Sequence, residues 1–475
     1  MKMRLWGTLV FLFFTWVCAG AQRKNSYQAN PLPDKWTYDD VMFQQTLPVD
    51  DNWWRVFEDA TLDSLISVAI KQNPDVMMAM NRIDMAKSSM RMARGAFFPS
   101  LSLNAGWSRQ KTSGYISDLQ PEAYNGYYSG TADMQWQIDV FGSLRDKFRA
   151  QKENYIVSKE DYNATMVSLC AQVATAYFYY LEQQQLLQVL QRNAASQDVV
   201  VKITEVRYNT GLASKLDVAQ AKSVYYSTLA SIPATEAAVA QYRNTIAVLL
   251  GLYPEDLENS LTTLRPLPNY VEPVGVGMPA QLLLRRPDVR AAEHQVNAQA
   301  ALLGVAKKEW FPTFFLNGTF GYSSHDLKNM GKRAGMVWSI APSMSWTIFN
   351  GGQRLYNVKM QRAQLDETIN QFNNTVLTAV QEVDNAMGNY KSSIRQISAC
   401  QQMVNQGRDA FRLSLDLYKQ GLSEFQNVLD AQRSLLSYEN ALVQAKGVSL
   451  IYLVQMYQSL GGGWNYNATV DKSRK

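Results

Sequence analysis

An internal repeat constrains the fold of this chain more than any other feature of its sequence. The stretch "NPDVMMAMNRIDMAKSSMRMARGAFFPSLSLN", which starts at Asn73, aligns with "RPDVRAAEHQVNAQAALLGVAKKEWFPTFFLN", which starts at Arg286. The offset is 213 residues here and becomes 210 further along, where Tyr208 matches Tyr418. A shared period of this kind indicates that one structural unit occurs twice. We therefore expect two copies of the same arrangement of helices and strands.

Each copy contains two stretches in which apolar and polar residues alternate, at about 100–110 and 129–140 in the first copy and about 313–323 and 336–348 in the second. A period of two is typical of β-strands. A single strand of this kind would most simply be half-buried in a soluble sheet. Four strands with Trp near their ends and Gln, Asp, Ser and Thr on one face are instead typical of a transmembrane β-barrel.

Long helices follow the strands, at 143–209 in the first copy and about 352–419 in the second. Neither Gly nor Pro occurs from Ser143 to Thr210, and apolar residues recur at steps of three and four. This spacing predicts coiled-coil packing, and a helix of that length spans roughly 100 Å. A tight turn that contains Gly211 in the first copy and Gly421 in the second then leads into a returning helix.

The predicted fold is therefore mainly α with a β-barrel part, built from the unit helix–strand–strand–long helix–helix repeated twice. Four strands per chain cannot close a barrel, and open sheet edges cannot face lipid. Three chains would supply twelve strands, the smallest closed number that we expect to leave a passage. The long helices would continue the barrel as a tunnel on one side of the membrane.

The expected organisation along the chain follows from these patterns. It consists of a signal peptide at 1–21, an extended segment at 22–61, the first repeat at 62–265, the second repeat at 266–463 and a C-terminal tail at 464–475.

The N-terminus has the layout of a secretory signal, with basic residues, an apolar stretch that ends at Val17, and small residues. Cleavage after Ala21 and cleavage before a lipid-modified Cys18 are both compatible with it. After Val17 no apolar run approaches the roughly 20 residues that a membrane-spanning helix needs. The exported chain is therefore expected either to be soluble or to cross a membrane as a barrel.

Composition and motifs argue against several classes of function. The net charge of +5 is small for 475 residues and no long basic run occurs, so nucleic acid is not an expected partner. Cys170 and Cys400 match no metal spacing and are read as buried free thiols, and His294 and His325 lack a neighbouring ligand cluster. No phosphate-binding or catalytic motif occurs. We predict no catalytic, metal or cofactor-binding residues, and no enzyme.

Three segments carry a resemblance to a known family. The segment Leu282–Tyr322, the motif "WWRVFEDATLDSLI" at Trp53–Ile66 and the motif "LYKQGLSEFQNVLDAQRSLL" at Leu417–Leu436 closely resemble the TolC-like outer membrane factors, in particular their OprM/NodT-type branch. The resemblance covers about residues 50–463. It implies a homotrimer in the outer membrane of a Gram-negative bacterium, with a shared 12-stranded barrel and a periplasmic helical tunnel.

The resemblance also implies a function and partners. It implies the exit duct of a tripartite pump that expels drugs and other small molecules, served by a periplasmic adaptor (membrane fusion protein) and an inner-membrane pump of the RND type. Many members of this branch carry an N-terminal lipid such as palmitate, for which Cys18 would be the site. A structural coiled-coil protein of the cell envelope is the alternative function, and a soluble periplasmic enzyme is a third. The strand pairs argue against the structural coiled-coil protein, because such a protein needs no barrel face.

The same resemblance implies site residues at the tunnel tip. The two positions of the family's aspartate ring are Asn427 and Asp430 here, so one carboxylate is an amide. Tyr418 matches a tyrosine that holds the tip closed in some members, whereas the basic position of that lock reads Ser423. The lock would then be absent or rebuilt with Arg207, Lys215 or Asp217. The residues expected at the tip and its adaptor contact are Arg207, Tyr208, Gly211, Lys215, Asp217 and Gly421.

Overall fold

The computed structural model describes residues 35–38, 42–44, 52–111, 124–257, 261, 265–268, 274–277, 285–462 and 464. All of these residues belong to one compact unit, Pro33–Lys475. The predicted signal peptide, Cys18 and nearly all of the predicted C-terminal tail lie outside the described residues.

The first repeat follows a short N-terminal part. The N-terminal part contains β1 (Phe43–Gln44) and the 3-10 helix η1 (Trp53–Phe57). The elements that follow are α2 (Ala60–Gln72), α3 (Pro74–Gly95), β2 (Ser100–Lys111), β3 (Tyr124–Ile138), α4 (Ser143–Asn209), α5 (Lys215–Leu249) and α6 (Pro254–Leu257). The segment that we expected to be extended up to residue 61 thus contains helical turns. Asp59 starts α2, because its side chain accepts a hydrogen bond from the backbone N–H of Thr61 at 2.8 Å.

The second repeat contains the same succession of helix, two strands, long helix and returning helix among its elements. They are β4 (Val274–Gly275), α8 (Pro287–Lys308), β5 (Thr313–Ser324), the 3-10 helices η2 (Leu327–Asn329) and η3 (Arg333–Gly335), β6 (Met336–Ser345), α9 (Gln353–Lys419) and α10 (Phe425–Ser459). The long helices α4 and α9 have 67 residues each, and the returning helices α5 and α10 have 35 each. These matching lengths confirm the predicted duplication.

Local chemistry explains where the helices begin and turn. The side chain of Asn73 accepts hydrogen bonds from the N–H groups of Asp75 and Val76 at 2.8 and 3.3 Å, which caps α3 before Pro74. The turns after α4 and α9 place Gly211 and Gly421 at a φ of 75°. Residues with a side chain adopt this conformation only at a cost, so glycine suits both turns.

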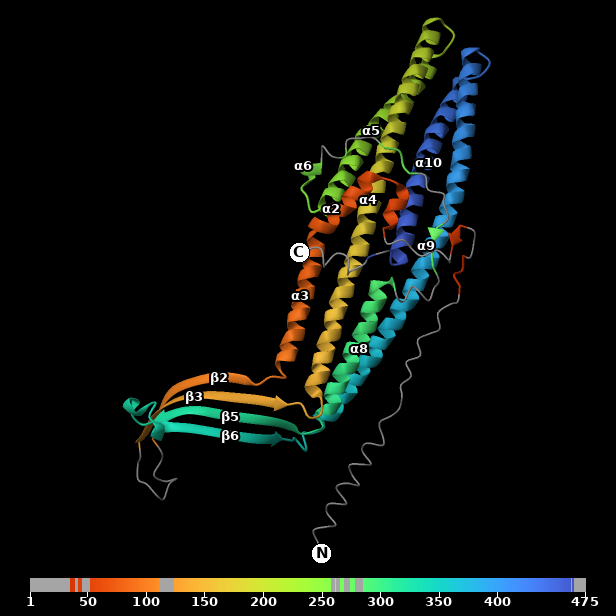
Figure 1. The fold of residues 1–475 in the computed structure, drawn as a ribbon. Coiled ribbons are helices and arrows are strands. Elements are labelled where there is room, and N and C mark those ends of the chain that lie inside the picture. Colours follow the sequence, from red (N-terminus) through yellow and green to blue (C-terminus); the bar gives the residue numbers. More distant parts are fainter. Residues whose placement is uncertain are drawn as a thin grey trace. The chain divides into compact units, whose positions relative to one another are not determined.

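The two helical hairpins, α4–α5 and α9–α10, lie side by side (Figure 1). Their turns are at the end opposite to the sheet, because α4 and α9 each start directly after a strand. Helix α8 packs against both α4 and α9, and α10 packs against α4, so the second repeat is joined to the first along much of its length. Helix α3 packs against α4 and α2.

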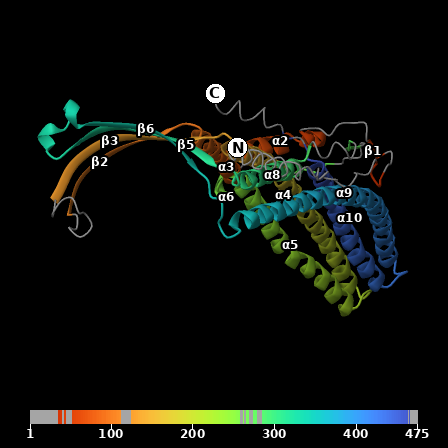
Figure 2. The same ribbon diagram turned by 90° about the horizontal axis from the view of Figure 1, so that it is seen from below.

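The sheet has four antiparallel strands in the order β2-β3-β5-β6, and Figure 2 shows it as a curved layer. The register places Ser100 opposite Gln135 within the first repeat and Thr313 opposite Ser345 within the second. Strand β3 begins at Tyr124, before the start at about residue 129 that we expected, because its first residues continue the ladder with β2 to Lys111.

The two faces of the sheet differ in the way the alternation predicts. Large apolar side chains on one face are well exposed: Leu101, Leu103, Trp107, Trp338 and Ile340. The other face carries polar side chains that bond across strands, such as Asn104 to Asp133 at 2.8 Å and Thr319 to Asp133 at 2.7 Å. A soluble sheet would cover its apolar face with other elements, which the described part of this chain does not do.

The core lies where the N-terminal part crosses the middle of the helices. Trp53 is almost fully buried and stacks on Tyr457 of α10 with ring centroids 5.3 Å apart. Phe57 packs edge-on against Phe178 of α4 at 4.8 Å. Nearby, the hydroxyl of Tyr177 donates to Asp59 at 2.6 Å. These contacts fasten the segment from Trp53 to Asp59 to both hairpins.

Glycine permits a close approach of β5 to β3. A Cβ added to Gly321 would lie 2.2 Å from the carbonyl oxygen of Gly130 and 2.7 Å from the Cα of Thr131. A Cβ added to Gly318, three residues earlier on the same strand, would lie no closer than 3.5 Å to any neighbour. The two strands can therefore keep their present spacing only if residue 321 has no side chain.

We expect Gly321→Ala to destabilise the folded sheet by about 1–3 kcal/mol, because the backbone atoms that it meets cannot move aside cheaply. Gly318→Ala serves as the matched control and should cost much less. Denaturant unfolding followed by tryptophan fluorescence measures both. Equal stability of the two variants would contradict this account of the strand spacing.

Candidate functional site at the hairpin turns

The turns of the two hairpins are joined by a small apolar cluster. Its buried members are Val200, Val201, Ala221, Val224, Tyr418, Phe425, Val428 and Leu429. They come from α4, α5, α9 and α10, so both repeats contribute. We call this group the tip cluster.

Tyr418 is the polar centre of the tip cluster. Its ring is buried against Phe425, with centroids 5.1 Å apart, and the guanidinium of Arg207 lies over it, 4.8 Å from the centroid. Its hydroxyl donates to Asp217 Oδ2 at 3.3 Å. Burial, with the nearby Asp217 carboxylate, raises the pKa of Tyr418 above its ordinary value, so the neutral hydroxyl is kept as a donor.

Arg207 also fastens the two turns together directly. Its Nη1 donates to the backbone carbonyl of Lys419 at 2.7 Å, across the boundary between repeats. Asp217 is held in turn by Ser214, whose hydroxyl lies 2.7 Å from Oδ1. Of the three residues that could rebuild the lock around Tyr418, the structure brings Arg207 and Asp217 into contact with it. Lys215 lies on the exposed surface at the start of α5.

The other predicted residues lie on the solvent side of the turns. Asp430 is exposed on α10 and accepts a hydrogen bond from Gln426 at 3.0 Å. Asn427 is also exposed and donates to the hydroxyl of Ser423 at 2.9 Å. Asp430 and Asn427 therefore lie on one helical face, one turn apart, outside the apolar tip cluster.

Exposed side chains surround the glycines of both turns. Tyr208 is 44% exposed, and the leucines that follow Gly211 and Gly421 are 66% and 71% exposed. Large apolar side chains that are exposed to solvent at both turns are typical of a surface that another helix covers.

Asp133 is a further polar residue with several partners, and no motif in the sequence marks it as a site residue. On the polar face of the sheet its carboxylate accepts hydrogen bonds from Asn104, Thr131 and Thr319, at 2.7 to 2.9 Å. The alternation had placed Asp133 on that face. Its partners on the neighbouring strands could be identified only from the register.

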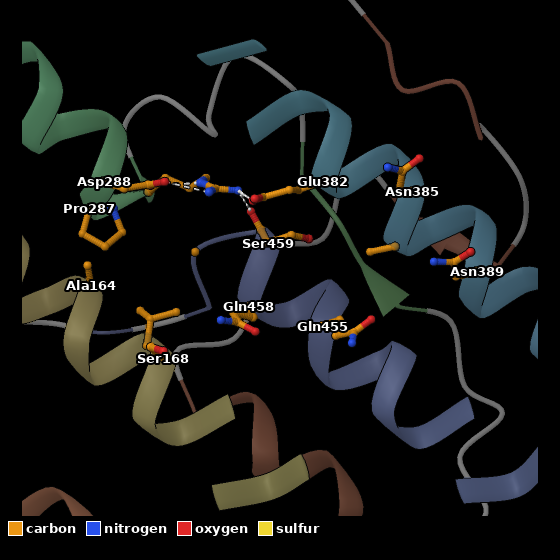
Figure 3. A pocket seen from close by; sticks show the side chains of 14 residues that line it. Ala164, Ser168, Pro287, Asp288, Glu382, Asn385, Asn389, Gln455, Gln458 and Ser459 are labelled. Carbon is orange, nitrogen blue, oxygen red and sulfur yellow. Dashed lines mark hydrogen bonds and ion pairs between the residues drawn. The ribbon is translucent and has the colours of Figure 1, made fainter. Parts of the chain in front are cut away.

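A cavity of about 420 Å³ lies between the start of α8 and helices α4, α9 and α10 (Figure 3). Arg286 crosses it and pairs with Asp288 at 2.7 Å and Glu382 at 2.6 Å, and it donates to the carbonyl of Ser459 at 3.1 Å. In the first repeat Asn73 occupies the matching position and donates to the carbonyl of Leu249 at 2.9 Å. The guanidinium thus clamps α8 to α9 and α10.

Other candidate groups are accounted for by structural contacts. Cys170 and Cys400 are both free and buried. His294 pairs with Glu153 at 2.7 Å, and His325 lies 2.6 Å from the carbonyl of Gly126. Over the described ranges, no three His, Cys, Asp or Glu side chains are grouped so that they could hold a metal ion.

None of the helices in the part of the chain that the structure describes combines the length and the apolar character needed to cross a membrane.

Comparison with known proteins gives consistent matches over nearly the whole chain. The model of the outer membrane efflux protein family matches residues 65–252 and 278–462. The antibiotic efflux pump outer membrane protein ArpC of Pseudomonas putida is 28% identical, with 94% of each chain covered. The solvent efflux pump outer membrane protein SrpC of the same species is 30% identical over 86% of this chain and 87% of its own. Among solved structures, the outer-membrane channel OprN superposes with a TM-score of 0.87 at 28% identity, covering 92% of this chain and 98% of that one.

The geometry of the tip cluster predicts unequal effects for two cationic residues. We expect Arg207→Ala to lower the local opening free energy around Tyr418 by about 1–2 kcal/mol, because it removes both the contact with the ring and the bond to Lys419. Amide hydrogen exchange of residues 415–425 should then accelerate roughly tenfold. Lys215→Ala, the matched control, should leave it unchanged. Equal exchange in both variants would show that Arg207 does not hold the turns together.

Proposed function

Because the chain belongs to the outer membrane efflux protein family, we propose that it works as the outer membrane channel of a tripartite efflux pump. In this role it is a passive exit duct for small molecules, with a part in the outer membrane and a helical part in the periplasm. The relatives ArpC and SrpC are named for the efflux of antibiotics and solvents, and we propose small organic compounds of these kinds as cargo. The channel itself catalyses no reaction in this proposal.

One observation carries the proposal: the four-stranded sheet has two open edges. Strands β2 and β6 are its two edges, and each has a strand on one side only. Its apolar face is exposed, and unpaired backbone groups cannot face lipid without a large cost. Pairing β6 of one copy with β2 of the next removes both edges. Three copies would close a barrel of twelve strands, which supports a homotrimer.

The repeat supplies the register of that missing pairing. Within the chain β3 pairs with β5, and Asp133 lies opposite Thr319. The matching strands are β6, at an offset of 210 from β3, and β2, at an offset of 213 from β5. Applying these offsets places Ser343 opposite Gly106 of the next copy, and Pro342 opposite Trp107. Polar residues then meet on the inner face and apolar residues on the outer face.

The hairpin turns are the part of the chain that we propose for docking and gating. We propose that a periplasmic adaptor packs its own helices on the turns around Tyr208, Gly211, Lys215 and Gly421, and that an RND-type inner-membrane pump supplies the energy. Contacts of Tyr418 with Arg207 and Asp217 support a lock that keeps the two hairpins of one chain together. In a trimer, Asp430 and Asn427 would form rings of three at the narrow end of the tunnel.

The proposed barrel is tested by cross-linking between copies. We expect Ser343→Cys combined with Gly106→Cys to form a disulfide between chains in outer membranes, since directly opposite residues of antiparallel strands lie within disulfide reach. Ser343→Cys combined with Ser100→Cys, six residues out of register, is the control and should not form one. Products are separated on a non-reducing denaturing gel. A cross-linked pair only in the control would contradict the register.

The function is tested in cells. Deleting the gene should increase susceptibility to exported drugs and solvents, and the wild-type gene should restore resistance. Unchanged susceptibility to a broad panel of compounds, with a protein that is freely soluble and monomeric, would support the alternative of a structural envelope protein instead.

The proposed gate is tested by electrical recording. We expect Asp430→Ala to weaken block by multivalent cations and to raise the single-channel conductance in planar bilayers, because a ring of three carboxylates attracts cations to the narrow end. Asp409→Ala removes an exposed carboxylate from α9 and serves as the control. Identical currents and identical block in both variants would count against a gate at residue 430.

A further inference from the structure

The junction between the two repeats of one chain is held by two ion pairs and one histidine–carboxylate contact. Their acidic members on α4 are Asp146, Glu153 and Glu160, spaced at intervals of seven residues, and their basic members lie on α8. The pairs are Asp146 with Lys308 at 2.6 Å, Glu153 with His294 at 2.7 Å, and Glu160 with Arg290 at 2.7 Å. We call this set the ion ladder. Heptad spacing places all three carboxylates on the same face of α4.

The duplication shows where a second junction of this type must lie. Helix α3 is the counterpart of α8, and helix α9 is the counterpart of α4. Within one chain α3 packs on α4 and α2, whereas α9 packs on α8 and α10. The face of α3 that corresponds to the ladder face of α8 is therefore available to the α9 of another copy. This step rests on the trimer of the proposed function.

At that second junction both members of every ion pair are replaced. Asp146 and Lys308 correspond to Tyr356 and Gly95, Glu153 and His294 to Ala363 and Asn81, and Glu160 and Arg290 to Asn370 and Met77. All six of these counterparts are exposed in the single chain, whereas the ladder residues are buried or half-buried. Loss of charge on both sides together is expected of two faces that meet each other.

A stripe of methionines occupies the rest of that face of α3. Met78, Met85 and Met92 recur every seven residues and are 48%, 61% and 71% exposed. Their counterparts on α8 are Ala291, Ala298 and Val305, which are only 4%, 5% and 9% exposed. The second repeat thus shows that these positions are covered once the junction forms. Methionine suits such a seam, because its flexible side chain fills irregular gaps.

We propose that the subunits of this protein join along an apolar seam that lacks the ion ladder, in which the methionine face of α3 packs on α9 of a second copy. The exposed side chains of Tyr356 and Met360, at 65% and 51%, form the facing surface on α9. The repeats around the ring are then held alternately by an ion ladder within a chain and by a methionine seam between chains.

The alternation of charged and apolar junctions makes the pairing of the helices specific. If α8 of one copy packed on α9 of another, its three basic residues would face Tyr356, Ala363 and Asn370 and would lose their carboxylates. If α3 packed on α4 at the ladder face, Met77 would cover Glu160 and strand its charge. Unpaired charges of this kind are costly when buried, so each junction rejects the other's partner.

A double-mutant cycle that transplants one rung of the ion ladder tests the seam. The variants are Met77→Arg, Asn370→Glu and both together, which places the chemistry of the Arg290–Glu160 pair between subunits. The readout is the temperature at which the unboiled oligomer, extracted in detergent, dissociates on a denaturing gel. Each single variant should lower that temperature, and the double variant should recover at least half of the loss. Only the double variant should then become sensitive to salt, because its new contact is ionic.

Met77→Arg combined with Gln371→Glu is the matched control, since residue 371 points about 100° away from residue 370 on the helix. It should show no recovery. If the double variant is no better than the sum of the single variants, the seam is wrong even though the trimer stands. If the wild-type protein itself is a monomer in outer membranes, the proposed function fails with it.

A second measurement covers the case in which the charged variants fail to fold. Asn81→Cys with Ala363→Cys occupies the positions that correspond to His294 and Glu153. The pair should form a disulfide between chains in the native oligomer, and each single cysteine variant should not. A stable oligomer that remains uncross-linked under oxidising conditions would overturn the proposal.

Discussion

The structure depends on backbone hydrogen-bonding groups at two sheet edges, which have no partner strand in the described part of the chain. Four strands form a sheet with two open edges, and one face of that sheet exposes Leu103, Trp107 and Trp338 to whatever surrounds it. No element in the described part of the chain covers this face. The helices of the hairpins, in contrast, bury many of their apolar side chains. A lipid environment and further copies of the same strands resolve both problems at once. The trimer that we propose follows from that constraint together with membership of the family.

Because the unit is duplicated, the contacts between the two repeats of one chain indicate which contacts to expect between chains. Each junction between the first and second repeats, whether strand on strand or helix on helix, has a counterpart that one chain leaves open. The counterparts have diverged in chemistry. The junction inside the chain carries charges, as in Glu160 with Arg290, and the open one carries methionines, as in Met85. Divergence of this kind lets two similar interfaces coexist in one ring without exchanging partners.

The tip also consists of two equivalent turns whose side chains have diverged. Gly211 and Gly421 shape two equivalent turns, but they differ in the tyrosine that precedes them: Tyr418 is buried, whereas its counterpart Tyr208 is 44% exposed. Arg207 and Asp217 of the first repeat hold Tyr418. The lock that we propose therefore lies between repeats, where a relative movement of the two hairpins would break it.

Local pattern by itself determined the duplicated unit, the long helices and the two-faced strands. Periodicities of two and of about three and a half residues are set by the backbone, so they can be read before any contact is known. The start of β3 at Tyr124 was missed, because the residues Asn125 to Tyr128 alternate poorly and pair only once β2 lies beside them. The tertiary structure alone decided that Arg207 and Asp217, rather than Lys215, meet Tyr418, and that Asp146, Glu153 and Glu160 find bases on α8. These contacts join residues up to about two hundred positions apart, and sequence spacing within one helix carries no information about which distant helix will face it.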